Sequence, residues 1–224
     1  YFLYPFKKFM IQLSDIKSAI KKETILISIM HANNEVGTIQ PIQEISQLAK
    51  EHSIVFHTDA AQSAGKITSD VKKLGVDLLS VAGHKLYAPK GIGALYVKNG
   101  TELEKFMHGA GHENGIRAGT KNILEIVGLG KACELAKKNI DKNYQHMKNM
   151  RDKLQSKIEN LDFPTLINGH PDRRLPNTLS VSFKNIEANH FLDNIPELAV
   201  SAGSACHSGS YSISSVLSAM NIPL

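Results

Sequence analysis

The chain has 224 residues, 42% of them hydrophobic and 21% charged, with a formal net charge of +5. These proportions are typical of a folded globular protein and exclude collagen-like, low-complexity and disordered classes. No apolar run approaches the roughly 20 residues that a membrane-spanning helix needs, so we expect no membrane role. The lysines of residues 137–153 are interleaved with acids, which indicates a solvated helix face and not a nucleic-acid site.

The chain starts at Tyr1 and not at Met, and its opening residues lack the charged, apolar and small-residue zones of a secretory signal. We therefore expect that the beginning is cut and that any targeting segment lies outside this sequence. Only two cysteines occur, Cys133 and Cys206, so no disulfide framework is visible and a reducing compartment is indicated. The cytosol is the default expectation, and a mitochondrial location stays open.

Four short apolar segments in the first half predict buried strands, and helical or loop segments separate them. They are residues 24–31, 53–59, 76–82 and 93–98. This alternation predicts an α/β domain with a mainly parallel sheet. Pro41 suits the first position of a helix, and the residues after it are apolar at helical spacing. That helix places one apolar face on the sheet: Ile42, Ile45, Leu48 and Ala49.

The second half changes character, because residues 122–160 are mostly helical in pattern. Its apolar positions recur at helical spacing and include Ile126, Leu129, Ala132, Leu135 and Ala136. We predict an interdomain helix with Cys133 as a core residue. Residues 177–183 then alternate like an antiparallel strand, and a helix is expected near residues 190–193. The prediction is a large domain at residues 1–137 and a smaller α+β domain at residues 138–224.

Lys85 is a candidate for covalent chemistry, since it follows a predicted strand and precedes a Gly-rich turn. A lysine amine can form a Schiff base with an aldehyde cofactor, and burial or neighbouring cations make it more nucleophilic. A solvated surface lysine explains the residue equally well when it is considered alone.

Two further polar residues follow predicted strands. Asp59 ends one of them, at the carboxyl edge of the sheet where ligands of open α/β folds gather. A carboxylate there could pair with a protonated pyridine nitrogen, although a plain helix N-cap is the simpler reading. Asn34 could donate to a ring oxygen, but turn formation by Asn33 and Asn34 explains that pair as well.

Five motifs, in this order and spacing, strongly resemble the cysteine desulfurase family with its selenocysteine lyase relatives. They are HANNEVGTIQPI, HTDAAQSAGK, AGHKLYAPKGIGALYV, HGAGHENGIRAGT and SAGSACHS, and they cover nearly the whole chain. The resemblance implies a class-V aminotransferase-like enzyme of fold type I that uses pyridoxal 5'-phosphate. Its implied fold is a large domain with a mainly parallel sheet plus a smaller α+β C-terminal domain.

The resemblance also implies the roles of individual residues. Lys85 corresponds to the Schiff-base lysine, Asp59 to the partner of the pyridine nitrogen, and His84 to a contributor to the phosphate site. Asn34 and Gln62 correspond to ligands near the ring oxygen. Thr120 corresponds to a residue that reaches the neighbouring subunit's phosphate, which implies a homodimer. No metal ligand is implied. Ala82 stands where many desulfurases carry a phosphate-binding serine, which slightly favours the lyases.

Cys206 lies in a Gly/Ser-rich stretch whose small polar residues suit an accessible loop better than a core, although a buried structural cysteine is the alternative. The resemblance implies that the substrate amine displaces Lys85, which then moves the α-proton. The Cys206 thiolate takes sulfur and leaves alanine and a persulfide. A thiolate needs nearby positive charge, and His207 is a candidate neighbour.

Several alternatives stay open at this stage. The chain could be a desulfurase that supplies sulfur to an acceptor in iron–sulfur or thiolated-RNA pathways, a selenocysteine lyase, or a cofactor-poor fragment with a binding role. An aminotransferase would share Lys85 and Asp59 but would not need Cys206. The family's phosphate loop, stacking histidine and carboxylate-binding arginine are expected outside both ends of the sequence, so we expect weak or absent turnover from the isolated chain.

Overall fold

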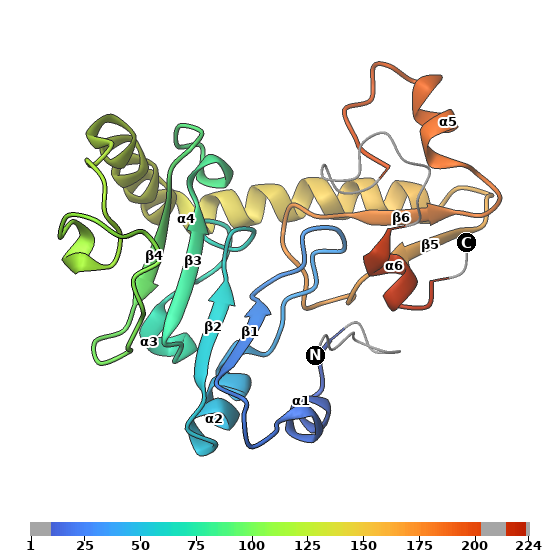
Figure 1. Cartoon of the computed structure of the whole chain (residues 1–224). Coiled ribbons are helices and arrows are strands. Elements are labelled where there is room, and N and C mark those ends of the chain that lie inside the picture. The colour runs from blue at the N-terminus through green and yellow to red at the C-terminus, as the bar shows by residue number, and fades with distance from the viewer. Residues whose placement is uncertain (1–9, 203–213, 223–224) are drawn as a thin grey trace. The chain divides into compact units, whose positions relative to one another are not determined.

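The computed structural model describes residues 10–202 and 214–222 (Figure 1). The chain forms two compact units. The sheet unit comprises residues 21–31 and 42–141, and the C-terminal unit comprises the described parts of residues 1–20, 32–41 and 142–224. The boundary near residue 137 between a large and a small domain stays a prediction.

The sheet unit is built on four strands that lie side by side in the order β1-β2-β3-β4 (Figure 1). Their bounds are Leu26–Met30 for β1, Val55–Asp59 for β2, Leu78–Ala82 for β3 and Gly93–Val97 for β4. The first three strands are parallel, and β4 pairs with β3 in the antiparallel direction. All four predicted strands and the mainly parallel α/β sheet are therefore confirmed.

One face of this sheet is buried, and the other is only partly covered by the described residues. On the buried face, Phe56 and Thr58 of β2 are almost inaccessible to solvent. Helix α2 (Ile42–Glu51) contacts β2 and buries the four apolar residues predicted from its periodicity. Helix α3 (Val71–Leu74) contacts α2. The alternate residues Val55, His57 and Asp59 are half-buried on the opposite face, because successive side chains of a strand point to opposite sides.

The predicted long helix is confirmed as α4 (Ile123–Glu159), which begins in the sheet unit and ends in the C-terminal unit. In the sheet unit, small residues of α4 allow close contacts. A Cβ at Gly128 would lie only 2.8 Å from Cδ of Pro89. Of the predicted apolar stripe, only Ala132 is buried among the described residues, and Leu135 and Ile126 are exposed.

The prediction that Cys133 is a core residue is wrong, because Cys133 is exposed. It directly follows the buried Ala132, and a step of one residue turns a side chain by about 100° around the helix axis. Only a narrow stripe of α4 faces the packed interior. Apolar residues on either side in the sequence therefore do not bury this thiol.

The C-terminal unit contains α1 (Leu13–Ala19), the antiparallel strands β5 (Thr165–Asn168) and β6 (Ser180–Phe183), α5 (Ala188–Asp193) and α6 (Ser215–Ala219). The predicted strand within residues 177–183 and the helix near residues 190–193 are confirmed. The rings of Phe163 and Phe191 lie 6.4 Å and 6.2 Å from that of Phe183. These aromatic contacts help to hold α5 on the two-stranded sheet.

Candidate active site

Asp59 is the last residue of β2 and is half-buried at the carboxyl edge of the sheet. Its Oδ1 accepts a hydrogen bond from the backbone N–H of Ala61 at 2.8 Å. One carboxylate oxygen therefore stabilises the turn that follows β2, and no helix begins there for Asp59 to cap. The other oxygen, Oδ2, makes no hydrogen bond to a residue that the structure describes, so a carboxylate oxygen is available to a cationic ligand.

Lys85 lies in the short 3-10 helix η1 (Gly83–Leu86), directly after β3, and is half-buried. The chain approaches itself closely at the start of η1, since a Cβ on Gly83 would lie 2.6 Å from the carbonyl oxygen of Ile92. Gly83 N–H donates to that same oxygen at 2.9 Å. Only glycine fits there, so the backbone that carries Lys85 is held against the start of β4.

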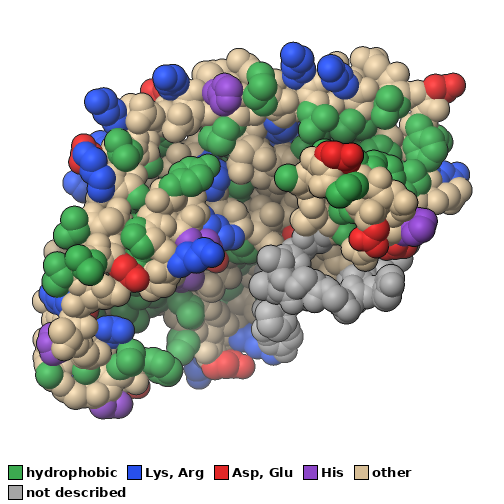
Figure 2. Space-filling view, turned by 90° about the horizontal axis from the view of Figure 1, so that it is seen from above, with side chains coloured by type: hydrophobic (Ala, Val, Ile, Leu, Met, Phe, Trp, Pro, Cys, Tyr) green, Lys and Arg blue, Asp and Glu red, His purple; other side chains and the backbone are tan. Residues whose placement is uncertain are grey.

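Asp59 and Lys85 follow neighbouring parallel strands, since Asp59 pairs in register with Ser80 of β3. The carboxyl ends of parallel strands meet at one edge of a sheet, which is where ligands of open α/β folds bind. Seen from above this edge, Lys and Arg side chains lie beside a His side chain on the left-hand part of the surface (Figure 2). The fold thus supplies an amine and a carboxylate on adjacent strand ends.

Gln62 and Lys66 lie in the turn that follows Asp59. The Lys66 Nζ donates to the backbone carbonyl of Gln62 at 2.9 Å. Burial lowers the pKa of Lys66, and the positive charge of Lys85 lowers it further. This second ammonium group near Lys85 was not identified from the sequence. The available signal was its position seven residues after Asp59, inside the HTDAAQSAGK motif.

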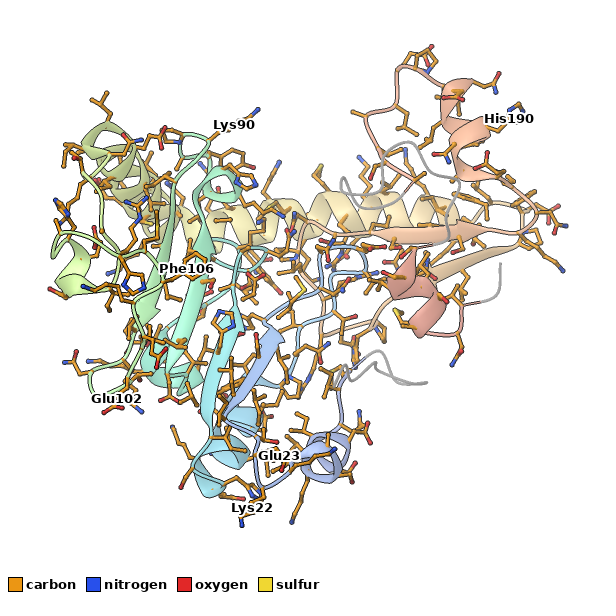
Figure 3. The ribbon with its side chains drawn as sticks, viewed as in Figure 1. Lys22, Glu23, Lys90, Glu102, Phe106 and His190 are labelled. Carbon is orange, nitrogen blue, oxygen red and sulfur yellow. The ribbon has the colours of Figure 1, made fainter. Side chains whose placement is uncertain are left out.

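Replacement of Lys85 by Met should raise the pKa of Lys66, because one of the two causes that lower it is the charge of Lys85. Burial should still hold the pKa below that of a free lysine. The titration of ¹³C-methylated lysine resonances by NMR measures this. Lys90→Met is the matched control, since Lys90 points away from the ribbon in the loop before β4 (Figure 3). An unchanged Lys66 titration in Lys85→Met would show that the two amines do not interact.

The remaining candidates differ in their surroundings. His84 is exposed in η1 beside Lys85, and Thr120 is exposed in the loop that precedes α4. Exposure leaves both side chains accessible to a phosphate group. The role of Thr120 at a subunit interface stays a prediction.

Asn34 belongs to the C-terminal unit, and its neighbour Asn33 takes the structural role in the turn. The Asn33 Oδ1 accepts from the backbone N–H groups of Glu35 at 2.8 Å and Val36 at 2.9 Å. Asn34 itself is exposed. Turn formation therefore occupies the side chain of Asn33 and not that of Asn34.

Cys206 lies outside the described residues, so its predicted accessibility and its neighbour His207 stay predictions. Within residues 10–202 and 214–222, no group of three or more His, Cys, Asp or Glu side chains could hold a metal ion. None of the helices in these ranges combines the length and the apolar character needed to cross a membrane.

A histidine that sequence reasoning missed lies on the partly covered face of the sheet. His57 Nδ1 lies 2.7 Å from the Oγ of Ser28, and its Nε2 lies 2.8 Å from the Oγ of Ser80. Burial lowers the pKa of His57, and the negative charge of Asp59 acts in the opposite direction. The signal for it was its spacing of two residues from Asp59, which places both on one face of β2.

The chain matches the family described as aminotransferase class-V over residues 2–222. It therefore belongs to that family, whose members use pyridoxal phosphate. The half-buried amine of Lys85 and the carboxylate of Asp59 fit such a cofactor, because one can bind its aldehyde and the other its ring nitrogen.

Curated relatives narrow the resemblance further. The chain is 49% identical over 212 residues to a protein named cysteine desulfurase IscS from Dictyoglomus turgidum, covering 94% of this chain and 54% of that protein. It is 47% identical over 223 residues to the protein of the same name from Vibrio vulnificus, covering 99% and 55%. The chain thus spans about half the length of these relatives.

Solved structures agree with the observed fold. A protein titled NifS-like protein is 34% identical, with a TM-score of 0.88 over 100% of this chain and 59% of its own. A structure titled "SspA in complex with cysteine" is 38% identical, with a TM-score of 0.81 over 100% of this chain and 62% of its own. These likenesses confirm the predicted fold type I architecture.

Proposed function

We propose that this chain is the greater part of a pyridoxal-phosphate-dependent cysteine desulfurase. The observation that carries the proposal is the placement of Lys85 and Asp59 on the ends of adjacent parallel strands. Relatives at 47–49% identity that bear the name cysteine desulfurase support it.

The proposal gives each residue near the sheet edge one task. Lys85 binds the cofactor aldehyde and then moves a proton at the substrate α-carbon, since a half-buried amine can act as a base. Asp59 holds the pyridine nitrogen protonated through its free carboxylate oxygen. The cofactor, when bound, withdraws electrons from the substrate α-carbon.

The remaining candidates would orient the cofactor. By the family resemblance, Gln62 and Asn34 would hold its ring oxygen, and His84 would hold its phosphate. Thr120 reaches the phosphate of a neighbouring subunit, so a homodimer is part of the proposal.

The sulfur-transfer step is assigned to Cys206. Its thiolate forms a bond to the sulfur of L-cysteine, and the bond between that sulfur and the β-carbon breaks. The β-carbon keeps the electron pair and takes up one proton, which balances the proton lost from the substrate thiol. The products are L-alanine and a persulfide on Cys206. A nucleophile of this kind must be a thiolate, because the thiol is a poor nucleophile.

L-Cysteine is the proposed substrate. The similar structure of SspA in complex with cysteine supports this choice. Release of selenium from L-selenocysteine is the second candidate, and Ala82 favours it. Ala82 ends β3 directly before η1, where a serine hydroxyl is lacking. A comparison of alanine release from the two amino acids separates these activities.

Replacement of Cys206 by Ser tests the proposal most directly. Because turnover by this chain is expected to be weak, alanine release from cysteine is measured in a single turnover, with the chain in excess and pyridoxal phosphate added. It should fall by at least roughly 10²-fold, because the sulfur acceptor is removed. Cys133→Ser is the matched control: this exposed thiol on α4 has no role in the proposal, and its variant should keep the activity. Unchanged alanine release in Cys206→Ser would show that Cys206 does not accept the sulfur. Transfer of the amino group without alanine release, retained in Cys206→Ser, would point to a transaminase instead.

A protein that accepts sulfur or selenium from Cys206 also belongs to the proposal, as does a cytoplasmic location. The presence of only two cysteines in the chain supports a reducing compartment.

A further inference from the structure

The row formed by Ser28, His57 and Ser80 crosses three strands of the sheet. Ser28 lies on β1 and pairs in register with His57 of β2, and Ser80 lies on β3. Both ring nitrogens of His57 are within hydrogen-bond distance of a serine hydroxyl, at 2.7 Å and 2.8 Å. A ring that is held at both nitrogens has a fixed orientation. Serine hydroxyls can donate or accept, so they accommodate either tautomer.

The row lies next to Asp59, the carboxylate that we assign to the ring nitrogen of the cofactor. His57 and Asp59 are two residues apart on one strand, so their side chains share a face. Ser80 is the register partner of Asp59. Ser80 therefore bonds the ring of His57 and also pairs with Asp59 across the two strands.

The charge balance around this histidine is simple. The side chains of β1 and β3 that bond His57 are the neutral hydroxyls of Ser28 and Ser80. Among the described residues, Asp59 is the charged group whose field acts on it. Burial lowers the pKa of His57 and opposes that field. Because its pKa is lowered, the ring adds no positive charge beside Asp59 at neutral pH.

We propose that His57 is a positioning residue for Asp59: Ser28 and Ser80 fix its ring on the face of β2 that it shares with Asp59, so that no cationic side chain takes this place and the Asp59 carboxylate stays available to the cationic ring nitrogen of the cofactor. An imidazolium at this position would compete for the same carboxylate. This inference rests on the proposed function, since it assumes that Asp59 binds a pyridinium group.

The first test needs no cofactor. The titration of His57 in the full chain is followed by NMR of its ring carbons, in the parent and in Asp59→Asn. The pKa of His57 should be lower in Asp59→Asn, because the charge that raises it is gone. Asp70→Asn is the matched control, since Asp70 caps α3 elsewhere in the sheet unit and should not affect the titration. An unchanged titration in Asp59→Asn overturns the proposal.

The second test measures the affinity for pyridoxal phosphate by absorbance. His57→Lys places a permanent cation near Asp59 and should weaken binding by roughly tenfold or more at neutral pH. His57→Gln is neutral and can still bond both serines, so it should keep the affinity within about threefold. If His57→Lys binds as tightly as the parent, the proposal fails. A folded His57→Gln that loses affinity like His57→Lys overturns it as well, because charge would then not be the cause.

The two tests also separate this inference from the proposed function. If the parent chain binds no pyridoxal phosphate, the proposed function is contradicted, while the cofactor-free titration still decides the coupling of His57 to Asp59. If the parent binds the cofactor and Asp59→Asn leaves the His57 titration unchanged, only the role of His57 is lost.

Discussion

Lys85→Met should abolish the covalent attachment of pyridoxal phosphate and lower alanine release by about 10²–10⁴-fold or more, the range typical of a lost proton-transfer group. The physical reason is that two tasks depend on this amine. It binds the cofactor aldehyde, and it moves the α-proton of the substrate. The visible absorbance of the lysine-bound cofactor measures the first task, and single-turnover alanine release measures the second.

The neighbouring lysines supply the controls. Lys66→Met removes another half-buried amine of the same site without removing the proposed nucleophile, so the visible absorbance should persist. Lys90→Met removes an exposed amine five residues after Lys85 and should behave like the parent. If Lys85→Met retains the absorbance while Lys66→Met loses it, the assignment of the nucleophile is wrong.

The second large effect concerns stability in acid. His31 follows β1, is 4% exposed, and its Nδ1 lies 2.9 Å from the Oγ of the buried Ser63. Burial lowers the pKa of His31 from 6.5 to about 4. Because burial disfavours the protonated ring in the folded chain, protonation of His31 favours the unfolded chain. The unfolded chain therefore binds more protons between these two pH values.

The direction of the effect follows from that difference. The stabilisation is complete above pH 6.5, where the ring is neutral in both states, and is lost as the pH falls from about 6.5 to about 4. The lost contribution to the free energy of unfolding is about 3 kcal/mol. Urea unfolding at a series of pH values, followed by circular dichroism, measures it.

His31→Gln removes the titrating ring but keeps an amide that can bond Ser63. Between pH 6.5 and 4 this variant should lose less stability than the parent does. His52→Gln is the control, since His52 is exposed after α2 and its replacement should leave the slope unchanged. Equal slopes for His31→Gln and the parent would show that another group causes the acid sensitivity.

Much of the candidate site could be predicted because its residues are adjacent to regular elements. Asp59 and Lys85 follow apolar strands in the sequence, and parallel pairing then brings strand ends to one edge. The sequence could not identify Lys66 or His57 in the same way, because their significance comes from neighbours distant in the chain. The partners of His57 lie 29 and 23 residues away.

Local patterns by themselves determined the strands, the helix after Pro41 and the long helix, whereas the class of protein followed from the resemblance of the five motifs to a known family. Period-two and period-3.6 spacing depends only on which side chains neighbours in the chain can bury. Tertiary structure alone decided that β4 runs antiparallel and that Cys133 is exposed. These features depend on contacts between segments distant in the chain, and no spacing within one segment encodes such contacts.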